Sequence, residues 1–206
     1  MQNELDDVKN QYRYMHKRKA SFRGFSVLDH SATIGRLINE TGSKSILDYG
    51  CGKGWQYKKR NIHKEWGVNF PYCYDPGVQE YATLAARVFD GVICSDVIEH
   101  IPPDYVETVL QDIFDHAGKF VFMSVATEAA RKILPDGRNV HLTVMPEAWW
   151  RDLIETLRPS NVRVELFFDN KPRKPRDPEK YRAKFEERKK RAQSRARRTK
   201  SGRTAN

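Results

Sequence analysis

The sequence predicts an α/β domain with a mostly parallel β-sheet that carries helices on both faces. Short apolar segments rich in β-branched residues alternate with amphipathic helical segments from about residue 30 to residue 168. That alternation is typical of parallel sheets built from β-α-β units. A glycine-rich turn follows the first apolar segment. We divide the chain into an N-terminal leader or lid (1–27), this domain (28–168) and a basic tail (169–206).

Apolar periodicity and breaker residues locate the elements in chain order. The first expected helix, 30–42, has Ile34, Leu37 and Ile38 on one face and ends at Gly42. The remaining helices are expected at 55–67, 102–118, 127–134 and 146–157, and the strands at 45–50, 71–77, 89–96, 119–126 and 162–168. A turn is expected at 135–139, and residues 140–144 are a candidate for one further short strand.

The two C-terminal helices carry the clearest signals. Helix 102–118 has Pro103 in its first turn, where proline is favoured, and Gly118 at its end. In helix 146–157 the adjacent residues Trp149 and Trp150 cannot both face the core. Trp150 falls on the apolar stripe, so we expect it to be core. Trp149 is then the candidate for a wall of the substrate site.

The positive charge of the chain is concentrated in the tail. The net charge is +10, but residues 171–206 contain 16 Lys and Arg against 4 Asp and Glu, which leaves 21 bases and 23 acids in residues 1–170. Such a segment is either a solvated appendage or a salt-sensitive, sequence-independent contact with RNA or DNA. Both interpretations remain open, and neither identifies nucleic acid as a substrate.

Other features of the composition exclude several classes. Cys51, Cys73 and Cys94 form no C-x-x-C pair, so neither a disulfide framework nor a cysteine zinc site is predicted. No apolar run reaches the roughly 18 residues that a membrane span needs, and the polar N-terminus has no signal-peptide pattern. We therefore expect a cytoplasmic protein without a membrane partner; the sequence indicates no oligomeric state.

The glycine turn, "LDYGCGKG", predicts a ligand site. Gly50, Gly52 and Gly54 remove side chains where a ligand touches backbone. The spacing is neither the G-x-G-x-x-G of dinucleotide sites nor a Gly-Lys-Ser/Thr phosphate loop. Asp48, which leads the turn, would repel a pyrophosphate but suits a cation. Asp75 lies 21 positions after Gly54, close to the spacing at which an acid binds a ribose. The alternative is a tight turn without a ligand.

Three motifs carry a family resemblance. "LDYGCGKG", "YCYDPG" and "FDGVICSDVIEHIP", in this order, resemble class I S-adenosylmethionine-dependent methyltransferases. Residues 47–57, 74–78, 90–102 and 136–150 also resemble a small branch of such enzymes from marine bacteria and their phages. The resemblance implies a Rossmann-like sheet, S-adenosylmethionine as cofactor, and methyl transfer to an oxygen or nitrogen nucleophile of an unidentified acceptor.

The same resemblance implies roles for individual residues. The glycines and Asp48 would bind the methionine part of the cofactor, Asp75 its ribose, and Asp96 would lie beside the methionine part. Glu99, His100 and His141 are the implied catalytic residues, with Trp149 beside His141 at the substrate mouth. The segment between the second strand and the "DVIEH" strand is too short for the family's usual helix and strand, so the sheet is abbreviated there. The adenine-binding acid is therefore unassigned, and the closing antiparallel strand pair is in doubt.

Several alternatives stay open at this stage. His100 is either a general base or a histidine that caps or supports its neighbours. Asp96, Glu99, His100 and His141 are also a possible oxygen and nitrogen metal site, but Asp96 is the expected cofactor contact and we assign no metal ligand. A nucleic-acid-binding protein with a non-catalytic cofactor pocket is the alternative function, and cleavage of S-adenosylmethionine is a third. The absence of an Asn/Asp-Pro-Pro-Tyr motif argues against methylation of DNA amino groups.

Overall fold

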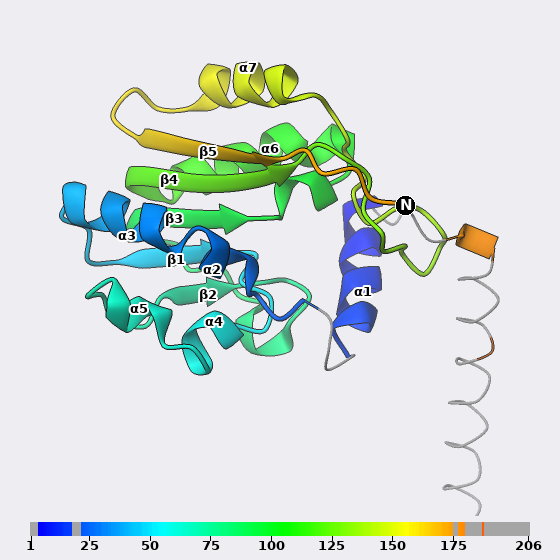
Figure 1. The fold of residues 1–206 in the computed structure, drawn as a ribbon, viewed down its shortest axis with the longest axis horizontal. Coiled ribbons are helices and arrows are strands. Elements are labelled where there is room, and N and C mark those ends of the chain that lie inside the picture. The colour runs from blue at the N-terminus through cyan, green and yellow to red at the C-terminus, as the bar shows by residue number, and fades with distance from the viewer. Residues whose placement is uncertain (1–3, 18–21, 175–176, 180–186, 188–206) are drawn as a thin grey trace, which may run out of the picture.

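A single open sheet of parallel strands forms the centre of the molecule (Figure 1). The computed structural model describes residues 4–17, 22–174, 177–179 and 187. The strands are β1 (Ile46–Tyr49), β2 (Tyr72–Tyr74), β3 (Phe89–Ser95), β4 (Ala117–Ala126) and β5 (Arg163–Asp169), in the order β2-β1-β3-β4-β5. Every neighbouring pair is parallel. The predicted Rossmann-like α/β class is confirmed.

The strand order reverses between β1 and β3. β2 pairs with one edge of β1, and the chain then crosses to pair β3 with the other edge. In open α/β sheets, ligands bind beyond the carboxyl ends of the strands at such a reversal. The glycine turn leaves β1 at this point, so the topology places it where a ligand site is expected.

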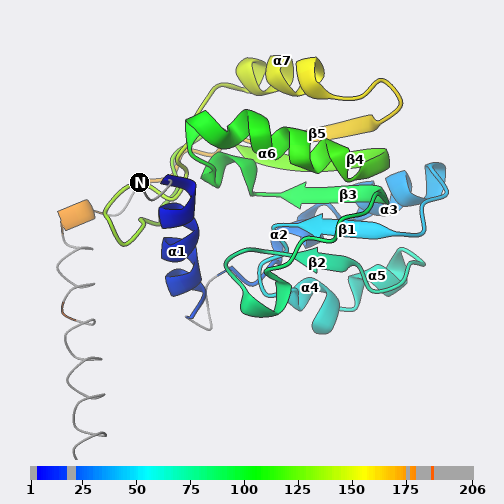
Figure 2. The ribbon, with the colours of Figure 1, turned by 180° about the vertical axis from the view of Figure 1, so that it is seen from behind.

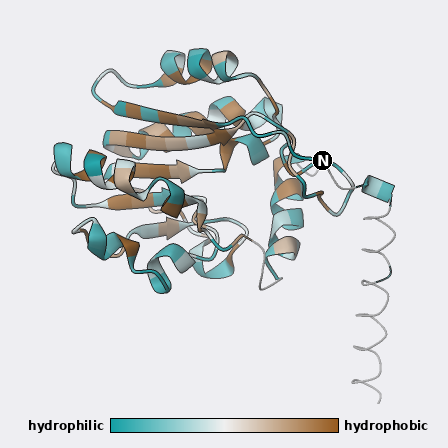
Figure 3. Cartoon of the chain, viewed as in Figure 1, coloured by the Kyte–Doolittle hydropathy of each residue, from teal (hydrophilic) through white to brown (hydrophobic). Residues whose placement is uncertain are grey.

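Helices cover both faces of the sheet, as predicted. α6 (Pro103–Asp115) and α7 (Glu147–Leu157) pack their apolar stripes on one face with Val92, Val121 and Met123 (Figure 2). α3 (Ser31–Glu40), α4 (Trp55–Lys58) and α5 (Ile62–Glu65) pack on the other with Ile93 and Phe122. Figure 3 shows mostly hydrophobic strands between helices whose outer faces are hydrophilic. Because strand side chains alternate between faces, β3 and β4 supply both cores.

Two predicted helices are corrected. Residues 127–134 are not a helix: Asn139 accepts a hydrogen bond from Ala130 N (3.0 Å) and donates one to Ala130 O (2.8 Å), which holds the segment in an irregular hairpin closed by the Ile133–Asn139 bridge. The helix predicted at 55–67 is two short helices, because Asn61 takes a left-handed φ of +52° between them. In the first case, hydrogen bonds with the side chain of Asn139, nine residues after Ala130, override the local helix propensity.

The connection between β2 and β3 is abbreviated, as predicted. It contains only the 3₁₀ turn η1 (Gln79–Tyr81) and irregular chain. β5 pairs directly and in parallel with β4, so within the described residues no antiparallel strand closes the sheet. Residues 140–144 are also irregular rather than a strand.

The N-terminal residues are part of the folded unit. α1 (Glu4–His16) buries Val8 and Met15 and lies across the carboxyl ends of the strands (Figures 1 and 2). α2 (Ser26–Asp29) begins before the predicted boundary at residue 28 and buries Val27 in the core. Whether α1 acts as a lid remains a prediction.

Most of the basic tail lies outside the described residues, and so does its predicted nucleic-acid contact. In the described part of the chain, no helix combines the length and the apolar composition that a membrane crossing requires.

Truncation of Trp150 tests the packing of α7. Trp150 is fully buried (0% exposed), whereas its neighbour Trp149 is half-buried and packs edge-to-face on it at 4.9 Å. We expect Trp150→Ala to lower the free energy of unfolding in urea by about 3–5 kcal/mol. Trp149→Ala is the matched control and should cost less than half as much. Equal losses would contradict the assignment of Trp150 to the core.

Candidate functional site

The candidate site lies at the carboxyl edge of the sheet, between the glycine turn, the end of β3 and α1. The predicted residues reach it from five places: the turn after β1, the end of β2, the end of β3, the 3₁₀ turn η2 (Ile98–His100), and the loop after β4 that contains His141. α1 adds side chains that the predicted site did not include. These residues meet at one edge because all the strands are parallel, so their carboxyl ends lie on the same side of the sheet.

The glycine turn requires glycine. Gly50, Gly52 and Gly54 have φ values of +87°, +59° and +63°, which L-residues with side chains rarely adopt. A Cβ on Gly52 would lie 2.5 Å from Phe22 O, and one on Gly50 would lie 2.3 Å from a methyl carbon of Val97. The segment Phe22–Gly24 and Val97 therefore pack directly on the bare backbone.

All the backbone donors of this turn are used within the protein. Gly50 N and Cys51 N donate to Tyr74 O, and Gly54 N donates to Cys51 O. Gly52 N donates to Asp75 Oδ2 (2.9 Å). Lys53 N and Trp55 N donate to the carbonyls of Phe22 and Arg23. A phosphate cradle needs free N–H groups, so the turn is unsuited to a pyrophosphate, in agreement with its atypical spacing.

Asp48 lies beneath the turn and is 1% exposed. It accepts a hydrogen bond from Gln56 Nε2 (2.8 Å). Burial raises the pKa of Asp48 to about 6 although Tyr57 and Gln56 stabilise its ionised form. A positively charged ligand above the turn would lower this pKa again, through the field of its charge rather than by direct contact.

Asp75 ends β2 and lies against the turn. Its carboxylate accepts hydrogen bonds from Gly52 N (2.9 Å) and Gly77 N (2.8 Å). Burial nonetheless raises the pKa of Asp75 to about 6. His16 Nε2 of α1 lies 3.7 Å from Asp75 Oδ1, but burial and two lysines lower the pKa of His16 to about 4. The nearby imidazole is therefore neutral at pH 7 and does not compensate the carboxylate charge.

Asp96 takes an unusual backbone conformation at the end of β3. Its φ is +56°, and it is exposed at the sheet edge. Ser124 of β4 supports this conformation: its hydroxyl donates to Asp96 Oδ1 (3.0 Å), and Asp96 N donates to Ser124 O (3.0 Å). Strained non-glycine residues of this kind concentrate at functional sites.

Glu99 is fully buried (0% exposed). Its Oε1 accepts a hydrogen bond from Ala126 N (3.1 Å), whereas its Oε2 has no hydrogen-bond partner among the described residues. Burial, with the charge of Asp96, raises the pKa of Glu99 to about 8. Without a nearby cation this carboxyl group is therefore mostly protonated at pH 7.

The two predicted catalytic histidines have defined tautomers. His100 Nδ1 lies 2.8 Å from Val140 O, and His141 Nδ1 lies 2.6 Å from Glu128 O. Because a carbonyl only accepts, each Nδ1 carries the proton and each Nε2 keeps its lone pair. Burial and the neighbouring His141 lower the pKa of His100 to about 3. Its environment therefore makes His100 a weak base.

The structure brings three predicted residues into one cluster. One ligand atom from each of Glu99, His100 and His141 lies within 4.8 Å of the others, and the two imidazole rings lie edge-to-face at 4.9 Å. Asp48, Asp75 and the glycines form a second group around the turn. Asp96 lies between the two groups along the chain and is electrostatically coupled to Glu99. Trp149 packs on the α6 and α7 core instead.

Several side chains at the site were not among the residues that the sequence predicted. Tyr12 of α1 donates to Val140 O (2.8 Å), lies 2.8 Å from His100 Nδ1, and contacts the rings of Phe22 and His100. His16 and Gln56 contact the two buried acids of the turn. The only sequence signal for Tyr12 is the mixture of aromatic and basic residues in "YRYMHKR", because its partner His100 is 88 residues away.

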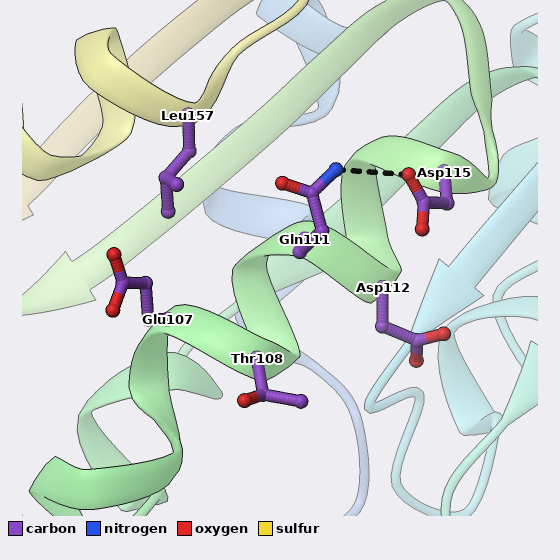
Figure 4. A pocket seen from close by; sticks show the side chains of 6 residues that line it. All are labelled: Glu107, Thr108, Gln111, Asp112, Asp115 and Leu157. Atoms are coloured by element: carbon purple, nitrogen blue, oxygen red, sulfur yellow. Dashed lines mark hydrogen bonds between the residues drawn. The ribbon is translucent and has the colours of Figure 1, made fainter.

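A hollow on the solvent face of α6 is separate from this site. It is lined by Glu107, Thr108, Gln111, Asp112, Asp115 and Leu157 (Figure 4). Gln111 Nε2 donates to Asp115 Oδ1 across it (2.9 Å). The hollow holds none of the predicted residues, and its lining has no feature of a catalytic site.

Comparison of the chain with protein-family models, curated proteins and solved structures found no match. The function is therefore argued from the geometry of the two groups of residues described above.

The ionisation of Asp48 predicts a pH-dependent substitution effect. Its folded-state pKa, about 6, exceeds the ordinary 3.8, so the native state binds more protons and loses stability as pH rises through this window. An amide side chain at this position does not ionise. The unfolding free energy of Asp48→Asn, relative to the unsubstituted protein, should rise by about 2–3 kcal/mol between pH 4 and pH 7.5 in urea titrations. Asp152→Asn, at an exposed position, is the control; a flat difference for Asp48→Asn would contradict the raised pKa.

Proposed function

We propose that the protein is a methyltransferase that uses S-adenosylmethionine to methylate an oxygen or nitrogen nucleophile. The observation that carries this proposal is the pairing of one buried and one largely buried acid, neither compensated by a cation, with a turn whose N–H donors are all occupied. Asp48 and Asp75 each have a pKa raised to about 6 by burial. Such a site disfavours phosphate and favours a cation. S-adenosylmethionine carries both an ammonium and a sulfonium group.

The proposed roles follow from position. Asp75 would accept hydrogen bonds from the ribose hydroxyls, and Asp48 would act through its field on the ammonium group. Asp96, an exposed residue directly after β3, would lie beside the methionine part. Direct contact between the cofactor and Gly52 requires Phe22–Gly24 to shift, because Phe22 O lies in the space that a ligand would use. The acidic side chains thus suit the charge of the cofactor, and its binding at Gly52 would depend on movement of Phe22–Gly24.

The chemical step needs alignment more than base strength. The acceptor's lone pair forms a bond to the methyl carbon while the carbon–sulfur bond breaks and its electrons return to sulfur, leaving S-adenosylhomocysteine. The acceptor's proton leaves to solvent. Holding the nucleophile in line with the sulfur supplies most of the rate. The low pKa of His100 is compatible with this step, because no strong base is required.

The alternative function is nucleic-acid binding without turnover. The 16 Lys and Arg residues of positions 171–206 favour contact with phosphates. In that case the chain would bind RNA or DNA in a salt-sensitive way and would release no S-adenosylhomocysteine. Cleavage of the cofactor, the third possibility, would be recognised by its different products.

Calorimetric titration with S-adenosylmethionine tests the proposal. We expect micromolar binding by the intact chain and at least tenfold weaker binding by Asp75→Asn. The substitution removes the negative charge of the carboxylate and replaces one of its two acceptor oxygens, which would bind the ribose hydroxyls, by an amide donor. Asp90→Asn is a matched control: Asp90 also accepts two backbone N–H groups, from Lys44 and Ser45, but does so away from the turn. A folded chain that binds no S-adenosylmethionine would overturn the proposal.

A further inference from the structure

We infer that Glu99, His100 and His141 bind one divalent transition-metal ion. Their ligand atoms lie within 4.8 Å of one another, from a fully buried acid, a partly buried histidine (His100) and a buried histidine (His141). An ion of tetrahedral geometry holds its ligands about 3.4 Å apart when the bonds are about 2.1 Å long. The cluster therefore closes onto an ion by side-chain movements on the order of 1 Å.

The carboxylate of Glu99 has one oxygen ready for a metal. Oε1 is held by Ala126 N (3.1 Å), and Oε2 is buried without a partner among the described residues. A buried polar atom without a partner is costly. A cation at this position would supply the missing interaction and stabilise the ionised carboxylate.

Both imidazoles have the arrangement found in metal ligands. Metal-binding histidines almost always donate the other ring N–H to a carbonyl or carboxylate, which orients the ring. His100 does this to Val140 O (2.8 Å), and His141 to Glu128 O (2.6 Å). Each histidine thus has Nε2 left to bind an ion. Tyr12 lies 2.8 Å from His100 Nδ1 and holds the same carbonyl, so α1 contributes to this outer layer.

Hydrogen bonds hold the ligands together before any ion binds. The backbone oxygen of Glu99 accepts from Leu142 N (2.8 Å) and Thr143 N (3.0 Å), and Thr143 Oγ1 donates to Ile101 O (2.7 Å). These bonds join η2, which carries Glu99 and His100, to the loop that carries His141. A site supported in this way is preorganised: folding already orders the ligand side chains, so ion binding does not have to order them.

The ligand set selects the type of ion. Two imidazole nitrogens and one carboxylate suit Zn²⁺ or a neighbouring transition metal such as Co²⁺ or Mn²⁺, whereas Mg²⁺ and Ca²⁺ prefer oxygen ligands alone. Three protein ligands leave a coordination position open, which is typical of a catalytic rather than a structural site.

The open position gives the ion a role that rests on the proposed function. A hydroxyl of the acceptor that binds there has a lowered pKa and loses its proton to solvent near neutral pH. The resulting oxygen attacks the methyl carbon, and the electrons of the broken carbon–sulfur bond return to sulfur. This role favours an oxygen acceptor over a nitrogen one. The ion site itself rests on the cluster geometry alone.

Zinc titration of the full-length chain tests the site. The protein is stripped with a chelator and titrated calorimetrically with Zn²⁺ and, separately, with Mg²⁺. We expect one equivalent of Zn²⁺, much weaker binding of Mg²⁺, and a rise in melting temperature with Zn²⁺. His141→Ala and Glu99→Gln should each weaken Zn²⁺ binding by at least tenfold. His63→Ala is the matched control, because His63 and His141 are equally buried (7% exposed) and His63 lies on α5.

Two results would overturn the site: no stoichiometric Zn²⁺ binding by the folded chain, or unchanged binding by a folded His141→Ala variant. If His141→Ala does not fold, His141→Asn provides the same comparison with a smaller loss of packing. Titrating the same samples with S-adenosylmethionine separates the two proposals. Cofactor binding without Zn²⁺ binding overturns the metal site alone, whereas Zn²⁺ binding without cofactor binding supports the metal site and overturns the methyl donor.

Discussion

Glu99 connects the parts of the site more than any other residue does. Its side chain accepts a hydrogen bond from Ala126 N at the end of β4, and its backbone oxygen accepts two from the loop that contains His141. The turn that carries Glu99 also carries His100, whose ring is held by Val140 of that same loop and approached by Tyr12 of α1. The turn after β3 therefore fixes His100 directly, and through its hydrogen bonds it also fixes the loop that carries His141 and contacts Tyr12 of α1. The buried Oε2 of this carboxyl group has no hydrogen-bond partner among the described residues, which costs free energy.

The carboxyl edge of the sheet holds two chemically different groups of side chains. Around the glycine turn, aspartates lie near backbone donors that are already used, an environment that suits a diffuse positive charge. Around Glu99, imidazoles and one carboxylate offer lone pairs, an environment that suits a compact ion. Asp96 comes between the two groups along the chain, and Ser124 supports its strained backbone.

The basic tail follows the last strand at the same edge of the sheet. β5 ends at Asp169, from which the chain continues beyond the carboxyl ends of the strands (Figure 1). The 16 bases of the tail therefore begin near the site, while residues 1–170 have nearly balanced charge. A phosphate-rich acceptor would be attracted by the tail and presented to an edge that is itself rich in acids. The tail would then attract the acceptor, and the edge of the sheet would carry out the reaction.

Local patterns in the sequence determined the sheet and its main helices. The apolar runs of β1, β3 and β4, the stripe of α6 and the glycine turn are signals contained within about 10–15 residues, which is the range over which periodicity operates. The shared direction of the strands follows from the β-α-β alternation, and this direction alone puts Asp75 and Asp96 at one edge of the sheet.

Only the tertiary structure decided what depends on distant partners. Asn139 converts the helix-prone segment 127–134 into a hairpin, Phe22–Gly24 fills the glycine turn, and α1 packs across the strand ends. Asp48, expected beside a ligand, lies buried beneath the turn because its side chain points toward Gln56 rather than outward. The sequence left a metal site as an unassigned alternative; the folded chain brings Glu99 and His100 together with His141. These outcomes rest on side-chain and packing contacts between residues eight or more positions apart, which the periodicity of a helix or strand does not specify.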